Sequence, residues 1–403
     1  MTAFQLLYEE KPCYESPGFK PFDVDREVLK NLGIDYPISS KVNDELLAGS
    51  AWYNSLFSRR TLNPENRYKE ELTDIDEELE VHNYTGLCPT HVLEISPSAG
   101  SCAAGCQYCL VTDGKHIQPI RVFTNYAEKL ARSLERNREK PLFYYFSPKT
   151  EAFSEPHLYN GLAHQILKTF LTHYEQYPDS GVRLFIATKA GMQHLNIRHA
   201  GNSVFELLKE LAGKVQVNGS IGIMPAYLRH ILEPHVASIE ERLEVLCQCR
   251  EAGIWAESVL CQPLFIPYLT EEVITHYMRQ LSAAGVRNIK PEFFTAEIRN
   301  LVLVAQYIHH YDPEKVGEFF APYLRESNQG HIKQRSRLAP EKKICAEKLA
   351  LIRDIAGAYG ITISLCNWVK KQLKEEAPFI REIDKESAAQ GYRCLGYQTR
   401  LFK

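Results

Sequence analysis

The sequence lacks a long apolar stretch. None of its runs approaches the roughly 18 uninterrupted apolar residues that a membrane-spanning helix needs. Residues 1–20 mix charged and apolar side chains, and they have neither the basic start nor the apolar core of a secretory signal. Internal repeats and low-complexity tracts are also missing. These absences exclude membrane-spanning, fibrous and disordered classes of protein, and we expect a cytoplasmic protein.

A strong excess of charge of one sign is missing as well. The 403 residues include 47 basic and 50 acidic side chains, which gives a net charge of −3 and no global positive field that would attract nucleic acid. One stretch, 331–343, is locally basic and could meet phosphate groups. It has no interleaved aromatic side chains for base stacking, and such a run is more often a solvated loop. A nucleic-acid partner is therefore not favoured.

Short apolar runs alternate with amphipathic stretches of helical length, which is typical of βα units and a parallel sheet. Strands are predicted over 91–96, 142–147, 183–188, 215–223, 254–261 and 286–294. Helices are predicted over 126–138, 156–175, 202–212, 238–252 and 270–284. Six βα units fall short of a closed TIM barrel. The predicted fold class is therefore α/β, a partial (β/α)6 TIM-like barrel with an open side.

The chain length allows more than one domain. Residues 1–88 are predicted to be an irregular and helical lead-in, in which the acidic piece 66–80 is helical. Residues 89–296 form the barrel, and 297–403 a mainly helical C-terminal extension with a strand at 361–365. We expect this extension, with helices at 301–310, 312–326 and 340–359, to cover the open side or to form a separate substrate lobe. The active site of a parallel barrel lies at the C-terminal ends of its strands.

The sequence has eleven cysteines. Disulfides are not expected in a reducing compartment, and eight scattered cysteines are typical of small buried apolar residues. The other three, Cys102, Cys106 and Cys109, lie within eight residues, directly after the first predicted strand. A C-x3-C-x2-C spacing, with Gly100 and Gly105 relieving the steric cost of a tight loop, lets three thiolates surround one metal centre.

Three cysteines are the informative number of ligands. A [4Fe-4S] cluster held by three thiolates leaves one iron open to a small bidentate molecule, and the amino and carboxylate groups of S-adenosylmethionine suit that position. An electron from the cluster then cleaves the sulfonium bond and releases a carbon radical. Two alternatives stay open. One is a zinc site, although a second ligand pair is missing and His116 is the only nearby candidate; the other is three core cysteines that are close by chance.

The cysteine loop with Tyr108, set after the first strand of a six-unit barrel, resembles the radical S-adenosylmethionine superfamily. Within that superfamily, residues 92–265 resemble the spore photoproduct lyase branch. The matching segments are Gln118-Pro-Ile-Arg121-Val-Phe-Thr-Asn125, Thr150-Glu151, Thr188-Lys189, Ser220 and Glu233-Pro-His-Val-Ala-Ser238-Ile-Glu-Glu-Arg242.

The resemblance implies a role for each matching residue. Cys102, Cys106 and Cys109 correspond to the cluster ligands, and Tyr108 to an aromatic residue that packs beside the cofactor. Thr150, Lys189 and Ser220 correspond to positions that contact the methionine carboxylate or the ribose of S-adenosylmethionine. A solvated strand-end lysine and a serine bonded to the backbone are the alternatives for the last two. The resemblance also implies a low-potential electron donor such as flavodoxin or ferredoxin.

Two groups of the lyase branch are missing. Its members carry a hydrogen-donating cysteine just after the second strand and a tyrosine after the third cluster cysteine, whereas here 146–150 contains no cysteine and Leu110 follows Cys109. We therefore expect a radical S-adenosylmethionine enzyme that abstracts hydrogen from a small-molecule, peptide or nucleotide substrate. A DNA lyase or repair enzyme and a non-enzymatic zinc-binding protein are the alternatives.

The remaining cysteines give two further hypotheses. Cys261 is predicted to end the fifth strand and to face the active-site cavity as a hydrogen donor, with a buried apolar role as the alternative. Cys345, Cys366 and Cys394 lie in the C-terminal extension, where some relatives carry a second cluster. Their spacing is too wide for a compact ligand motif, so an auxiliary cluster is not expected.

Overall fold

The computed structural model describes residues 70–76, 78–79, 92–109, 119–296, 298–324 and 337–394. Most of the lead-in predicted for 1–88, His116, Leu110 and residues 331–336 of the basic stretch lie outside these residues. The division of the chain at 88 and 296 stays a prediction. None of the described helices combines the length and the apolar character needed to cross a lipid bilayer.

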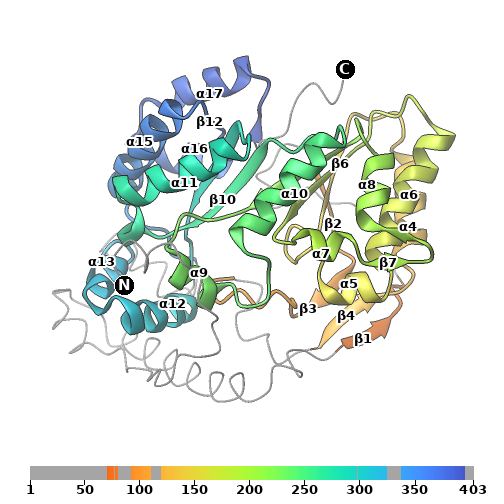
Figure 1. Cartoon of the computed structure of the whole chain (residues 1–403), viewed down its shortest axis with the longest axis horizontal. Helices are drawn as coiled ribbons and strands as arrows, with labels where there is room; N and C mark the ends of the chain where they lie inside the picture. Colours follow the sequence, from red (N-terminus) through yellow and green to blue (C-terminus); the bar gives the residue numbers. More distant parts are fainter. Residues whose placement is uncertain are drawn as a thin grey trace.

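A parallel sheet of seven strands lies at the centre of the described residues (Figure 1). Its strands are β2 (Val92–Ile95), β5 (Phe143–Phe146), β6 (Arg183–Thr188), β9 (Val215–Ser220), β10 (Ser258–Leu264), β11 (Asn288–Phe293) and β12 (Thr362–Ile363). They lie side by side in chain order, and every neighbouring pair is parallel. In a barrel the strands follow one another in this way, whereas here β2 and β12 are edge strands within the described part. The predicted α/β partial barrel is thus confirmed.

The strand predicted at 361–365 is part of this sheet. As β12 it pairs with β11, with Asn288 opposite Thr362 and Ile289 opposite Ile363. The Asn288 side chain supports the pairing, since its Oδ1 accepts a hydrogen bond from the Ser364 hydroxyl at 2.9 Å. A piece of the C-terminal extension therefore prolongs the barrel wall beyond the six predicted strands.

Helices cover the outer face of the sheet (Figure 1). They are α4 (Tyr126–Arg136), α5 (Glu155–Tyr159), α6 (Leu162–Gln176), α7 (Met192–Leu195), α8 (Val204–Glu210), α10 (Ile239–Glu251), α11 (Glu271–Ala283), α15 (Lys342–Ala358), α16 (Asn367–Leu373) and α17 (Ile380–Ala389). The largest apolar core lies between these helices and the strands. The single helix predicted over 156–175 is two helices, because Gly161 takes a left-handed φ of +71° between α5 and α6.

A second apolar core belongs to a group of short helices that we call the helical lobe. The lobe consists of α9 (Ala226–Leu232), the 3₁₀ helices η4 (Ile266–Tyr268) and η5 (Pro313–Lys315), α12 (Ile298–Tyr311) and α13 (Val316–Phe320). It lies below α15–α17, at the lower left of Figure 1, and Lys348 of α15 donates to the carbonyl oxygen of Leu269 beside η4 at 3.0 Å. Asp312 joins three of its elements, since the hydroxyls of Tyr227 and Tyr268 both donate to Asp312 Oδ2, at 2.5 and 2.7 Å.

A small sheet precedes the barrel helices in the chain. Its strands are β1 (Glu70–Thr73), β4 (Ile120–Phe123) and β3 (Ser98–Gly100), with β4 in the middle. The helix predicted over 66–80 is therefore wrong at 70–73, where β1 runs parallel to β4. Acidic composition favours a helix only weakly, and pairing with β4 overrides it. The Asn125 side chain fixes the next residues, because its amide both donates to and accepts from the backbone of Ile75 at 2.9 Å.

Candidate active site

The cysteine loop, residues 101–109, begins where β3 ends. Gly100 has a φ of +89°, and a Cβ atom there would lie 2.2 Å from the carbonyl oxygen of Pro119. Gly105 has a φ of +60°, and a Cβ would lie 3.1 Å from Cδ2 of His235. Both positions therefore require glycine, as the sequence predicts for a tight loop of this kind.

The three thiols influence one another across this loop. The pKa of Cys102 is raised to about 11, mainly by burial and also by the charge of Cys109, although the backbone N–H groups of Ala104 and Glu151 act in the opposite direction. Burial also raises the pKa of Cys106, with Lys189 acting in the opposite direction. Burial therefore disfavours the thiolate forms of Cys102 and Cys106, and a bound metal is the kind of cation that would offset this cost.

The donor set fits an iron–sulfur cluster. Among the described residues, no three His, Cys, Asp or Glu side chains converge as a single metal ion requires. A [4Fe-4S] cluster binds each thiolate to a different iron, and three cysteines of one loop are a ligand set that such a cluster takes. The roles of Cys102, Cys106 and Cys109 as ligands stay predictions.

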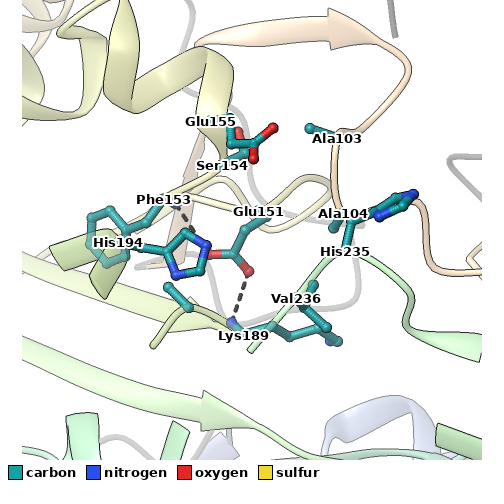
Figure 2. A pocket seen from close by; sticks show the side chains of 11 residues that line it. Ala103, Ala104, Glu151, Phe153, Ser154, Glu155, Lys189, His194, His235 and Val236 are labelled. Carbon is teal, nitrogen blue, oxygen red and sulfur yellow. Dashed lines mark hydrogen bonds between the residues drawn. The ribbon is translucent and has the colours of Figure 1, made fainter. Parts of the chain in front are cut away.

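A small pocket opens beside Ala103 and Ala104 of the cysteine loop (Figure 2). Its other walls are the segments after β5 and β6 and residues 235–236. The volume is about 20 Å³, which is room for about one water molecule. The pocket is therefore too small for a ligand of nucleoside size.

Glu151 joins two walls of this pocket. Its Oε1 accepts hydrogen bonds from the Thr188 hydroxyl at 2.5 Å and from the backbone N–H of Phe153 at 3.1 Å. Its Oε2 accepts from the backbone N–H of Lys189 at 2.8 Å, as Figure 2 shows. The carboxylate thus fixes the end of β6 against the segment that follows β5. Glu151 belongs to the matching segment Thr150-Glu151, but its position in the sequence does not indicate this role.

The structure brings Lys189 and Ser220 together, at the C-terminal ends of the adjacent strands β6 and β9. Lys189 Nζ donates to Ser220 Oγ at 2.6 Å. The Thr150 hydroxyl, in the segment after β5, is buried and has no hydrogen-bond partner among the described residues. The same holds for the hydroxyl of Ser147, whose φ of +50° is unusual for a residue other than glycine. Buried unpaired hydroxyls are uncommon, and they suit a polar group of a ligand.

Glu233 is the centre of a buried charge cluster that the sequence analysis missed. Arg242 Nη2 lies 2.7 Å and Arg229 Nη1 3.8 Å from Glu233 Oε2, and Lys189 Nζ lies 4.0 Å from Oε1. The Tyr108 hydroxyl also donates to Oε1. Burial opposes ionisation, but the cations Arg242, Lys189 and Arg229 hold the pKa of Glu233 at about 2.

This cluster carries an excess of positive charge. Three cationic side chains lie within 4.0 Å of the single carboxylate of Glu233, so the cations outnumber the carboxylate within this cluster. Both Lys189 and Arg242 interact electrostatically with Cys106. The site therefore favours additional negative charge beside the cysteine loop. In the sequence, the i, i+4 spacing of Arg229 and Glu233 is the feature that could have indicated this ion pair.

His157 anchors the start of the loop. It is buried, its Nδ1 bonds the carbonyl oxygen of Ala152 at 3.1 Å, and its Nε2 bonds the Ser98 hydroxyl at 2.9 Å. Burial lowers the pKa of His157 to about 4. The neutral ring thus donates to Ala152 and accepts from Ser98, which ties β3 to the segment before α5. No motif in the sequence marks this residue.

Cys261 does not lie where the sequence predicts. Strand β10 continues to Leu264, so Cys261 is inside the strand and not at its end. Leu260 belongs to the apolar cluster on the inner face of the sheet, whereas Cys261 belongs to the core on the outer face, beside Tyr277 of α11. Burial raises the pKa of Cys261 to about 12. The expectation that it faces the active-site cavity is wrong, and this removes the reason for a hydrogen-donor role.

The three C-terminal cysteines do not share one environment. Cys345 on α15 belongs to the outer core, and its thiol lies 3.8 Å from the carbonyl oxygen of Pro340. Cys394 belongs to the inner-face cluster, whereas Cys366 packs against both that cluster and the outer core. Cys366 and Cys394 both interact electrostatically with the buried Lys290. Cys345 and Cys394 therefore lie in different apolar clusters.

No family model matches this chain, and no curated protein matches it. Among solved structures it is similar to TsrM from Kitasatospora setae, a radical S-adenosylmethionine methyltransferase determined with cobalamin and a [4Fe-4S] cluster bound. The match has a TM-score of 0.35 and 16% sequence identity, and it covers 50% of this chain and 34% of TsrM. The matched part thus spans about a third of TsrM, and similarity of this degree does not bear on the ligands or the activity of this chain.

Proposed function

We propose that this protein is a radical S-adenosylmethionine enzyme whose cysteine loop holds a [4Fe-4S] cluster through Cys102, Cys106 and Cys109. The observation that supports the proposal most is the placement of the three-cysteine loop next to the buried charge cluster around Glu233, in which both Lys189 and Arg242 interact electrostatically with Cys106. When bound, the cluster and S-adenosylmethionine supply reductive cleavage of the sulfonium bond and a 5′-deoxyadenosyl radical that abstracts hydrogen from the substrate.

The residues around the loop have distinct tasks in this proposal. Lys189 is placed to pair with a ligand carboxylate, because its Nζ lies at the mouth of the barrel and is held by the Ser220 hydroxyl. Thr150 offers an unpaired hydroxyl to a second polar group of the ligand. Glu233 keeps Lys189 and Tyr108 in place and limits the local positive charge.

The reaction also needs partners. An electron has to come from a low-potential donor, for which flavodoxin or ferredoxin is suited. The substrate class stays open among small molecules, peptides and nucleotides. The lyase branch completes its reaction with a cysteine after the second strand, and the segment Ser147–Thr150 has none, so we do not propose DNA repair.

Iron analysis after anaerobic reconstitution tests the proposal. We expect about four irons per chain, the brown colour of a [4Fe-4S] protein and an electron paramagnetic resonance signal after reduction. Cys106→Ser should lose most of this iron. Cys247→Ser is the matched control, because Cys247 lies on α10, where its thiol lies 3.6 Å from the carbonyl oxygen of Ala284, away from the loop. A colourless wild-type protein with one zinc per chain would contradict the proposal.

A further inference from the structure

The second half of the cysteine loop is attached to the helical lobe. The backbone N–H of Gln107 donates to the carbonyl oxygen of Leu232, at the end of α9, at 2.8 Å. The Gln107 side chain is buried, and its Nε2 donates to the carbonyl oxygen of Gly105 at 2.7 Å. Its Oε1 accepts a hydrogen bond from the Tyr307 hydroxyl of α12 at 3.4 Å. Gln107 therefore links the loop to two helices of the lobe.

The next two loop residues also contact the lobe. Tyr108 packs its ring edge-on against Phe265 in the lobe core, with ring centroids 6.2 Å apart. Asn300 of α12 is 1% exposed, and its Nδ2 donates to the carbonyl oxygen of Cys109 at 3.4 Å. Asn300 Oδ1 has no hydrogen-bond partner among the described residues. Replacing Asn300 therefore removes little besides its contact with the loop.

The first half of the loop is attached to the barrel instead. The backbone N–H of Glu151, after β5, donates a hydrogen bond to the thiol of Cys102. The Ser98 hydroxyl is hydrogen-bonded to Nε2 of His157. Cys102 is thus contacted from the barrel, whereas the backbone of Cys109 is contacted by Asn300 of α12 and by Cys106 of the same loop.

We propose that Asn300 and Tyr307 are positioning residues that set the third thiol of the loop, and that metal loading of the loop in turn stabilises α12. The inference rests on the proposed function, because it requires that the loop binds the cluster. Coupling of this kind is reciprocal: if the lobe favours the loop geometry that binds metal, bound metal must favour the docked lobe by the same factor.

Asn300→Leu tests the inference, because leucine has the same number of side-chain heavy atoms in a similar branched shape and no donor. We expect the reconstituted variant to release iron to a chelator about tenfold faster than the wild type, within the usual range of such coupling. Asn300→Gln, which keeps an amide donor, should restore part of the slow release. Tyr307→Phe removes only a hydroxyl and should also speed the release of iron. It is the second test of the inference if Asn300→Leu folds poorly.

Tyr323→Phe is the matched control. Its hydroxyl donates to the carbonyl oxygen of Phe294 at 2.8 Å, within the same lobe core. This variant should release iron at the wild-type rate. Hydrogen–deuterium exchange of residues 298–311 gives the reciprocal readout, and reconstitution should slow exchange in the wild type and in Tyr323→Phe but much less in Asn300→Leu.

The outcomes separate the two proposals. A wild-type protein with about four irons, whose exchange in α12 is the same before and after reconstitution, overturns the coupling and leaves the proposed function intact. Release of iron at the wild-type rate from both Asn300→Leu and Tyr307→Phe also overturns the coupling and leaves the proposed function intact. A wild-type protein that takes up no iron overturns both.

Discussion

Glu233 is the residue on which the charge balance of the site depends most. It lies among Arg229, Arg242 and Lys189, and its side chain is inaccessible to solvent. Removing one partner of a buried ion pair leaves the other partners uncompensated, which costs more than the pair itself contributes.

Glu233→Gln should therefore destabilise the metal-free protein by roughly 3–5 kcal/mol. Urea unfolding followed by circular dichroism measures this free energy. Glu206→Gln is the control, because Glu206 pairs with Arg198 on the surface at 2.9 Å and glutamine keeps its capping contact with Ser203. A similar small change in both variants would show that the Glu233 cluster is not a buried network.

His157 gives the protein a dependence on pH. Its pKa is lowered from 6.5 to about 4 in the folded state, so the unfolded chain binds the proton more tightly. The stabilisation is complete above pH 6.5 and is lost as the pH falls from there toward 4, with a loss of about 2 kcal/mol at pH 5.

Urea unfolding at pH 7 and pH 5 measures this loss. His157→Gln, which keeps hydrogen-bonding groups and has no proton to gain, should be less stable than the wild type at pH 7 and should lose less on acidification. An equal pH dependence in the two proteins would exclude His157 as the source.

Among the elements, the β3–loop junction is the most constrained. Gly100 combines a left-handed φ with a carbonyl oxygen at 2.2 Å from a Cβ position, whereas Gly213 has a φ of +78° and no atom within 4 Å of its Cβ position. A comparison of alanine substitutions at the two positions therefore distinguishes the cost of backbone strain alone from the cost of backbone strain with a steric clash.

Gly213→Ala should cost about 1–2 kcal/mol, the price of a left-handed alanine. Gly100→Ala should cost more, because β3 or Pro119 has to move, and it should also reduce iron uptake by the adjacent loop. Thermal unfolding and iron analysis of both variants check this. Equal melting temperatures would mean that the β3–β4 contact adjusts easily.

The elements also show what sequence patterns predict well. The six barrel strands were predictable because βα alternation repeats along the chain. The bounds of β10 were not, since nothing in its apolar run indicates whether it ends at Cys261 or at Leu264. A shift of this size decides which residue lies at the mouth of the barrel. β1 was missed because its strand conformation depends on pairing with β4, about fifty residues away.

For the whole molecule, the cysteine loop could be found by spacing, and Lys189 and Ser220 by resemblance. The cluster around Glu233 could not, because it joins Arg229, Glu233 and Arg242, which follow β9, to Tyr108 of the cysteine loop and to Lys189 after β6. The contacts of Gln107 and Asn300 with the lobe depend in the same way on the assembled barrel. Local patterns predict elements and compact motifs, whereas these contacts exist only once the chain has folded.

The central claim is that the barrel mouth cleaves S-adenosylmethionine at a cluster held by the cysteine loop. The direct test is an anaerobic incubation of the reconstituted protein with S-adenosylmethionine and a strong reductant, followed by quantification of 5′-deoxyadenosine by mass spectrometry. The account predicts that the wild type and Cys247→Ser form this product and that Cys106→Ser does not. Absence of 5′-deoxyadenosine from a fully iron-loaded wild type, or equal amounts with Cys106→Ser, would contradict it.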